Sequence, residues 1–488
     1  MASLDTKVAR GVAWAAGAQA VIAVADMVSQ LLVVALFVAP KDLGLAFAAI
    51  PFYTALDYIA DAGIGSALIQ RDDHTPERVS TMFWFNLLIS TAMLVALCGI
   101  GPLYGWILDA PVVGWLLVAY GGKLVLQNIY AIPFALMRKE LRFSAIAKAR
   151  VVAHLSESVA RVAFAAAGAT VWCWTFAALT RAIVFGVAIQ LCHPYLPKLV
   201  FRPREVIPFV RFGLRSAASN VLYQIYTSMD APIIFHFFGK QALGIYGLAD
   251  SIVLEPIKTI ANVVTDVAFP TFAKLRGEAS AVGAQLVKFT RLNLLAVLPY
   301  AVIVVLVIPE ILRIFWLGDH WNATDLAWCA DAARILCVMA LFRALGLVGP
   351  PLLDGVGKPE YTLRYMIVAT IAVPLSFWVG AALLGDQLWF LSVAVAWAVG
   401  YPLAFAALAY LVTHTIGLDV RAYLRGTWGV IACCAIGTAV GFVVGAVLRD
   451  ASDPVRLVAM GGSALVVMLV LFATWQKITP RSIAAALA

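Results

Sequence analysis

Ionisable side chains inside long apolar stretches are the residues of this sequence best placed to do chemistry. A charge in the middle of a membrane is costly unless it faces protein or a water-filled cavity, so such residues mark candidate sites. Lys123 and Arg181 lie near mid-stretch and have no acidic residue three or four positions away. With four other basic residues they would bind an anion such as phosphate through charge-assisted hydrogen bonds. The candidate binding set is Lys123, Arg161, Arg181, Lys258, Arg334 and Arg343.

Acidic residues in the same stretches form a second candidate set. Carboxylates at mid-membrane can take up a proton or a sodium ion; no other cofactor and no metal is predicted. A simpler interpretation stays open, because Glu157 and Arg161 are four residues apart and can form a salt bridge that only lets a polar helix insert. The same holds for Asp331 and Arg334. The candidates for ion coupling are Asp26, Asp57, Asp61, Asp230 and Asp250.

The composition defines the setting of these charges. Of 488 residues, 63% are apolar and 13% charged, and the mean hydropathy is +0.93. Soluble domains are about 45–50% apolar and about 25% charged, so disorder, a coiled coil and an ordinary cytosolic enzyme are excluded. The 7 cysteines show no ligand spacing and are expected to be reduced. An all-α polytopic membrane protein is predicted.

Apolar runs of helix length predict fourteen membrane-spanning helices. Basic residues are concentrated in alternate loops and in both termini, 24 against 5 on the other side. Because cytoplasmic loops carry the excess of lysine and arginine, both termini are expected in the cytoplasm. The expected spans are 12–38, 43–68, 83–107, 112–136, 144–167, 172–191, 208–237, 242–269, 286–308, 326–347, 362–384, 388–412, 427–448 and 455–475.

A faint internal repeat divides the chain. Lys41 followed by Leu43-Gly44 corresponds to Lys240 followed by Leu243-Gly244, at an offset of 200 residues and six helices. An even number of helices gives the two units the same orientation in the membrane. The predicted parts are an N-terminal lobe 1–191, a cytoplasmic linker 192–207, a C-terminal lobe 208–412, and 413–488 with two additional helices and the cytoplasmic C-terminus.

Enzyme motifs are missing from the sequence. There is no GxxxxGK[ST] phosphate loop, no HExxH, and no segment outside the helices long enough for a catalytic domain. His154 is the one histidine well inside a helix, and a lone histidine is more often packed than catalytic. A membrane glycosyl- or acyltransferase is therefore a minor alternative to a transporter.

Four segments carry a family resemblance. The strongest is "DYIADAGIGSALIQRDDHTPERVSTMFWFNLL" at Asp57–Leu88; the others are Ala135–Arg150, Gly213–Phe235 and "LGDHW" at Leu317–Trp321. They resemble bacterial polysaccharide flippases of the Wzx type, in particular the WzxC-like branch. The resemblance implies the multidrug/oligosaccharidyl-lipid/polysaccharide (MOP) exporter superfamily, with two six-helix lobes and alternating access.

The resemblance also implies a substrate. Wzx-type flippases move undecaprenyl-diphosphate-linked oligosaccharides across the bacterial inner membrane for exopolysaccharide or O-antigen synthesis. A polysaccharide polymerase and a chain-length regulator are expected partners; nucleic acid is not, and a monomer is expected. The alternative is a multidrug or cation antiporter of the same superfamily, which six basic residues within the helices disfavour because they would repel cationic substrates.

Overall fold

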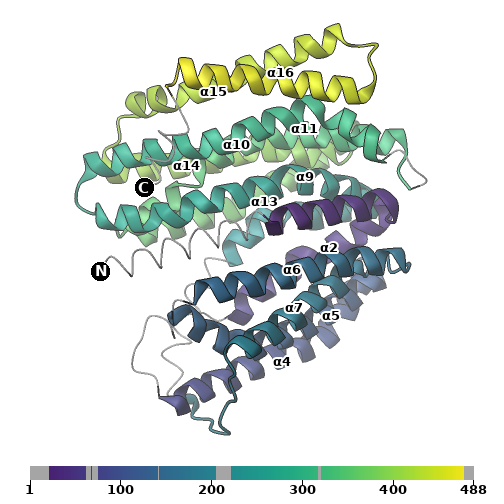
Figure 1. The fold of residues 1–488 in the computed structure, drawn as a ribbon, viewed down its shortest axis with the longest axis vertical. Coiled ribbons are helices and arrows are strands. Elements are labelled where there is room, and N and C mark those ends of the chain that lie inside the picture. The colour runs from purple at the N-terminus through teal and green to yellow at the C-terminus, as the bar shows by residue number, and fades with distance from the viewer. Residues whose placement is uncertain are drawn as a thin grey trace. The chain divides into compact units, whose positions relative to one another are not determined.

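The computed structural model describes residues 21–61, 68, 75–140, 142–204, 221–316 and 320–477. Every regular element in these ranges is a helix (Figure 1). Two compact units divide the chain, unit 1 at Met1–Gly244 and unit 2 at Ile245–Ala488. The lobe boundaries expected at 191 and 208 stay a prediction.

Unit 1 begins with the helix Val21–Leu36. It continues with α2 (Pro40–Asp61), α4 (Pro76–Ile107), α5 (Pro111–Lys139), α6 (Phe143–Ala166) and α7 (Cys173–Cys192). After a helical segment at 221–228, α9 (Asp230–Lys274) passes from unit 1 into unit 2. Unit 2 continues with α10 (Ala279–Trp316), α11 (Ala323–Gly346), α12 (Gly349–Gly355), α13 (Pro359–Leu388), α14 (Leu391–Ile416), α15 (Val420–Val447) and α16 (Asp453–Thr474).

All fourteen expected helices coincide with helices in the described residues, the seventh with 221–228 and the first turns of α9. Nine of the described helical segments are long and apolar enough to cross a membrane, whereas polar residues weaken the signal in α6 and α9. The all-α polytopic fold is confirmed.

Several boundaries differ from expectation, and two of the differences have a clear local cause. The third helix starts at Pro76 and not at 83, because Thr75 caps it by accepting a hydrogen bond from the Arg78 amide and Pro76 has its φ preset for a first turn. The seventh and eighth helices are joined by the single non-helical residue Gly239, at φ 81° and ψ −176°. A side chain there would strain the backbone, which explains why glycine makes this sharp kink.

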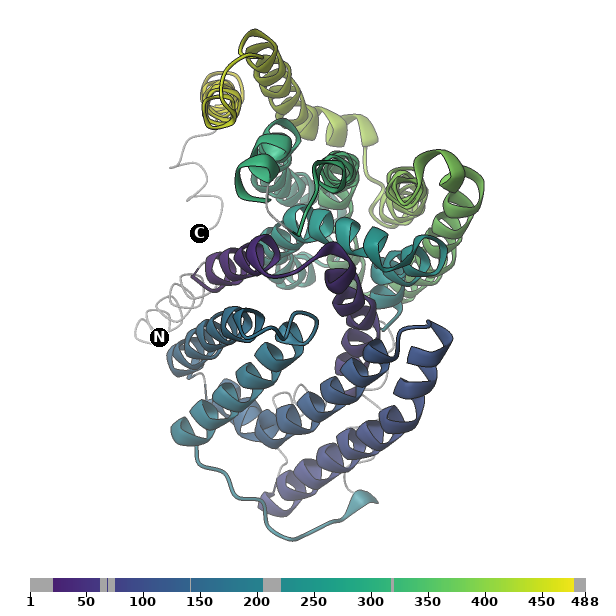
Figure 2. The same ribbon diagram turned by 90° about the vertical axis from the view of Figure 1, so that its right-hand side faces the viewer.

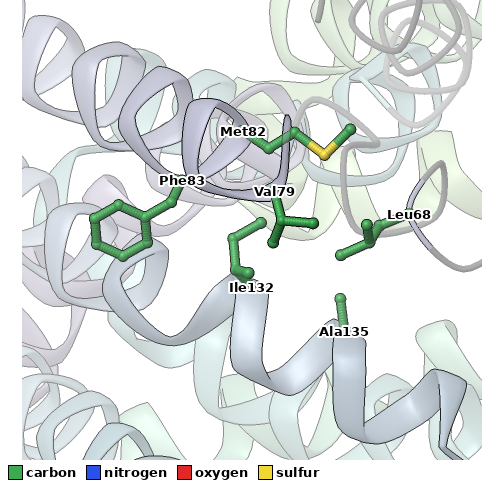
Figure 3. Close-up of a cluster of buried hydrophobic side chains, with 6 residues drawn as sticks. All are labelled: Leu68, Val79, Met82, Phe83, Ile132 and Ala135. Atoms are coloured by element: carbon green, nitrogen blue, oxygen red, sulfur yellow. The ribbon is translucent and has the colours of Figure 1, made fainter. Parts of the chain in front are cut away.

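The packing of α4 on α5 forms a buried core in unit 1 (Figure 3). Val79, Met82 and Phe83 of α4 lie against Ile132 and Ala135 of α5, and Leu68 joins the same cluster. In a membrane the contact between helices depends on such close packing, because lipid is as apolar as the side chains.

The two turns of the predicted repeat contact each other. A Cβ atom on Gly44 would overlap the Lys240 carbonyl oxygen, and one on Gly244 would overlap the Pro40 carbonyl oxygen. The two contacts are reciprocal and separated by the offset of 200 residues. Only glycine permits the backbones to approach so closely, and the symmetry of the contact supports the repeat.

Unit 2 has α10 at its centre, with α11, α15 and α16 packed against it. The last two helices form an antiparallel pair beside α10 (Figures 1 and 2). Two ion pairs fasten α16 to α10. Arg313 Nη2 lies 2.8 Å from Asp453 Oδ1, and Arg456 Nη2 lies 3.1 Å from Glu310 Oε1.

Candidate functional site

Three helices of unit 1 bring together a group of ionisable side chains, named here the polar cluster. Asp26 comes from the helix Val21–Leu36, His154, Glu157 and Arg161 from α6, and Arg181 from α7. The α6 residues are three and four positions apart, which places them on one face of that helix. Charged groups from separate parts of the chain therefore converge on one point.

Arg161 is the structural centre of the polar cluster. Its Nη1 donates to the Asp26 carbonyl oxygen at 3.2 Å and to Ser29 Oγ at 3.0 Å. Its Nη2 lies 3.7 Å from Glu157 Oε1 and 3.8 Å from Asp26 Oδ1. The residue is 7% exposed, and within the described ranges no acceptor reaches its buried Nε. The predicted pair Glu157–Arg161 is thus present, as part of a larger network.

Arg181 is the accessible cation of the cluster. Its Nη1 donates to Glu157 Oε2 at 3.1 Å, so the expectation that it has no partner is wrong. The partner comes from α6, the neighbouring helix, which spacing along one helix cannot reveal. The Arg181 side chain is 32% exposed, whereas that of Glu157 is 8% exposed. A ligand can therefore reach the Arg181 guanidinium more easily than the Glu157 carboxylate.

Lys123 also has a partner that its sequence neighbourhood did not indicate. Its Nζ donates to Asp57 Oδ2 of α2 at 2.8 Å and lies 5.3 Å from the centre of the Tyr53 ring. Tyr53 in turn stacks on Tyr120, with ring centres 4.0 Å apart. Lys123 has 6% of its side chain exposed and Asp57 24%. The lysine is enclosed, and in this structure its carboxylate partner is the more accessible of the two.

Two of the candidate cations of unit 2 pair with a carboxylate on their own helix. Lys258 Nζ lies 2.7 Å from Glu255 Oε1, and Arg334 Nη1 lies 3.7 Å from Asp331 Oδ1, both three residues apart. The second pair is the salt bridge that the spacing had left open as an alternative. Arg343 is buried at 3% exposure.

The other acidic candidates are less informative. Asp230 is buried where α9 begins, and its Oδ1 accepts from the Ala231 amide at 2.9 Å. Asp250 is half-buried on α9. Asp61 ends α2, but its side chain lies outside the described residues.

His154, like Glu157, is a residue of the cluster that the sequence placed in neither candidate set. Its Nδ1 lies 3.2 Å from Asp26 Oδ2 and 3.5 Å from Glu157 Oε2. The sequence feature that could have indicated its membership of the cluster is its spacing of three residues from Glu157. Ligand atoms of these three residues lie within 4.8 Å of one another, as in a metal site. Since Arg161 and Arg181 already face the carboxylates, the surroundings do not suit a divalent cation.

The fold of the chain is similar to that of solved membrane transporters. It matches the lipid II flippase MurJ in an inward closed conformation with a TM-score of 0.73 and 15% identity, over 95% of this chain and 98% of that one. It matches an inward-facing multidrug-resistance MATE transporter of the MOP superfamily with a TM-score of 0.63 and 17% identity, over 81% and 95%. At these identities the likeness concerns the fold.

Residues 33–325 match the family described as polysaccharide biosynthesis protein, and the chain belongs to that family. It is 24% identical to the lipopolysaccharide biosynthesis protein WzxC of Escherichia coli over 92% of this chain and 89% of WzxC. It is also 24% identical to the teichuronic acid biosynthesis protein TuaB of Bacillus subtilis, over 75% and 74%. The Rhizobium meliloti succinoglycan biosynthesis transport protein ExoT is 23% identical over 76% and 74%. The resemblance to polysaccharide flippases, and the expectation of a transporter over an enzyme, are confirmed.

Proposed function

We propose that this protein moves undecaprenyl-diphosphate-linked oligosaccharides across the bacterial inner membrane, for exopolysaccharide or O-antigen synthesis. Both termini lie in the cytoplasm, and the lobes 1–191 and 208–412 expose the binding site alternately to the two sides. The names of WzxC, TuaB and ExoT and the MurJ-like fold support this function. A polysaccharide polymerase and a chain-length regulator act after it, and the protein works as a monomer.

The observation that carries the proposal is the ion pair between the partly exposed Arg181 and the buried Glu157. A diphosphate cannot cross hydrocarbon unaided, because an unpaired anion loses its hydration there. A guanidinium replaces that hydration with two parallel charge-assisted hydrogen bonds, a geometry that suits phosphate oxygens. Arg181 is thus the first contact that the diphosphate makes in unit 1.

Glu157 holds Arg181 until the substrate arrives. When the diphosphate takes over Arg181, Glu157 does not become an isolated buried charge, since Arg161 lies 3.7 Å and His154 3.5 Å from it. The exchange of carboxylate for phosphate on Arg181 therefore proceeds without the large penalty of an uncompensated anion. Arg161 acts by holding Glu157 in place.

The remaining candidates complete the proposal. Lys123 joins the site when Asp57 releases it, and the cations that unit 2 contributes are Lys258, Arg334 and Arg343. Protonation, or sodium binding at a carboxylate, would release the basic partner and so couple transport to a gradient. Asp26, Asp57, Asp61, Asp230 and Asp250 remain the coupling candidates.

A multidrug or cation antiporter is the second candidate, because the MATE transporter shares the fold. Such a protein would use carboxylates to bind cationic drugs. In the polar cluster, however, Asp26 and Glu157 already face Arg161 and Arg181. Drug sensitivity of a deletion strain separates the two functions, since the flippase predicts no change.

The test uses proteoliposomes that contain the full chain and a fluorescent undecaprenyl-diphosphate oligosaccharide. Arg181→Ala should lower the translocation rate at least about 100-fold, a loss of about 3 kcal/mol that is typical of a hydrogen bond to a charged group. Glu157→Gln should instead tighten substrate binding while slowing release.

The control is Arg364→Ala, an exposed arginine on α13. Translocation by Arg181→Ala at the rate of this control, in equal amounts of protein, would contradict the assignment. Absence of translocation by the unchanged protein would refute the function itself.

A further inference from the structure

The segment His193–Arg202, named here the strap, is attached to the start of α4. Its backbone carries no helix, and it runs along the first turns of α4. Lys198 donates its amide to Ser80 Oγ at 3.0 Å, and Trp84 Nε1 donates to the Lys198 carbonyl oxygen at 2.9 Å. Arg202 donates its amide to Thr81 Oγ1 at 3.3 Å. These bonds fix the strap at one end of a membrane-spanning helix.

The strap presents large apolar side chains outward. Leu196 is 91% exposed, Leu199 89% and Phe201 49%. If these two leucines faced water, the protein would lack the hydrophobic stabilisation that burial gives, about 1.5–3 kcal/mol for each side chain. Hydrocarbon is the environment in which such side chains stabilise the protein.

A groove lies between the strap and α4. Its volume is about 540 Å³, within the range of about 300–1,000 Å³ that ligand pockets span. The lining is almost wholly apolar: Trp84, Leu87, Leu88, Thr91, Leu199, Val200 and Phe201. A single acyl chain suits a surface of this chemistry.

Basic side chains follow one another along the strap and just beyond it. Lys198, Arg202 and Arg204 are all exposed. One acidic residue, Glu77, interacts with two of these basic side chains: its Oε1 lies 2.8 Å from Lys198 Nζ, and Arg202 also acts on it electrostatically. The segment therefore keeps a positive charge beside the groove, and such charge at the end of a membrane helix attracts anionic lipid.

We propose that the strap and α4 form a binding site for an anionic glycerophospholipid. One acyl chain fills the groove along Trp84 and Leu88, and the phosphate contacts Arg202 and Arg204. The charge complementarity selects an anionic lipid over a zwitterionic one, and the apolar lining selects a long acyl chain over a free phosphate. This site does not depend on the transported substrate.

Native mass spectrometry of the full chain, with equal amounts of dioleoylphosphatidylglycerol and dioleoylphosphatidylcholine, tests the proposal. The expected result is a retained phosphatidylglycerol adduct. Arg202→Ala/Arg204→Ala should weaken it about fivefold for each arginine. Arg202→Lys/Arg204→Lys should keep it, as should the matched control Arg421→Ala/Arg425→Ala, two exposed arginines at the start of α15.

The groove is tested separately. Leu199→Asn changes an exposed lining residue and should weaken the dioleoyl adduct at least threefold, and dihexanoylphosphatidylglycerol should bind the unchanged protein no better than phosphatidylcholine. Equal retention of both dioleoyl lipids would overturn the proposal. So would an unaltered adduct in both Arg202→Ala/Arg204→Ala and Leu199→Asn, or displacement of phosphatidylglycerol by equimolar undecaprenyl phosphate.

Discussion

The two units place charge inside their helices in different ways. In unit 1 two of the pairs join separate helices: Lys123 of α5 meets Asp57 of α2, and Arg181 of α7 meets Glu157 of α6. In unit 2, Glu255–Lys258 and Asp331–Arg334 each lie within one turn of a single helix. Unit 2 also has ion pairs between helices, and two of them fasten α16 to the end of α10.

This difference separates two roles for buried charge. A pair within one turn neutralises its own helix and keeps doing so wherever that helix moves. A pair between helices exists only while the helices keep their positions, so a ligand or a proton that breaks it can change their arrangement. The pairs Lys123–Asp57 and Arg181–Glu157, which join helices and include candidate binding residues, are therefore suited to respond to a substrate.

The largest expected difference between the units concerns a matched pair of arginines. Arg161→Ala removes a buried guanidinium that faces both Asp26 and Glu157 and bonds to Ser29, and should destabilise the protein by about 3–5 kcal/mol. Arg334→Ala in unit 2 removes a side chain that is 38% exposed, and should cost less than about 1 kcal/mol. Unfolding of purified protein in mixed micelles of increasing denaturing detergent measures both values. Equal losses would remove the contrast between the units.

A smaller effect is expected for Lys123 and Asp57. A double-mutant cycle with Lys123→Met and Asp57→Asn should give a coupling energy of about 1–3 kcal/mol, because the contact is close and partly enclosed. The same cycle with Lys258→Met and Glu255→Gln provides the comparison in unit 2, where both side chains are more exposed. The free energies of unfolding in mixed micelles give both couplings. A coupling near zero for Lys123 and Asp57 would mean that their pairing does not stabilise unit 1.

The fold was largely predictable from the sequence, since the length of apolar runs and the alternation of basic loops reflect the thickness and charge of a membrane. Two of the missed boundaries have local causes. At Thr75-Pro76 a capping signal extends α4 beyond its apolar run, and at Gly239 one residue replaces an expected loop. Polar residues before an apolar run can still belong to its helix.

The candidate site was predictable only in its components. The sequence identified Arg161 and Arg181 as charges that need a reason to be buried, and the pairing of Arg161 with Glu157 follows from helical spacing. It could not reveal that Arg181 meets Glu157, or that His154 meets Asp26 across 128 residues. Contacts between helices depend on how the helices rotate and pack, which one sequence does not record.

The smallest predicted effect concerns the pairs within single helices. Asp331→Asn should change the free energy of unfolding by no more than about 0.5 kcal/mol, because a half-exposed pair three residues apart contributes little. It should also leave transport close to normal, since Arg334 Nε keeps its bond to the Val305 carbonyl oxygen at 3.3 Å. The same proteoliposome and micelle measurements apply. A loss of transport as large as that of Arg181→Ala, at unchanged stability, would show that unit 2 also uses its charges on the substrate and would end the division of roles between the units.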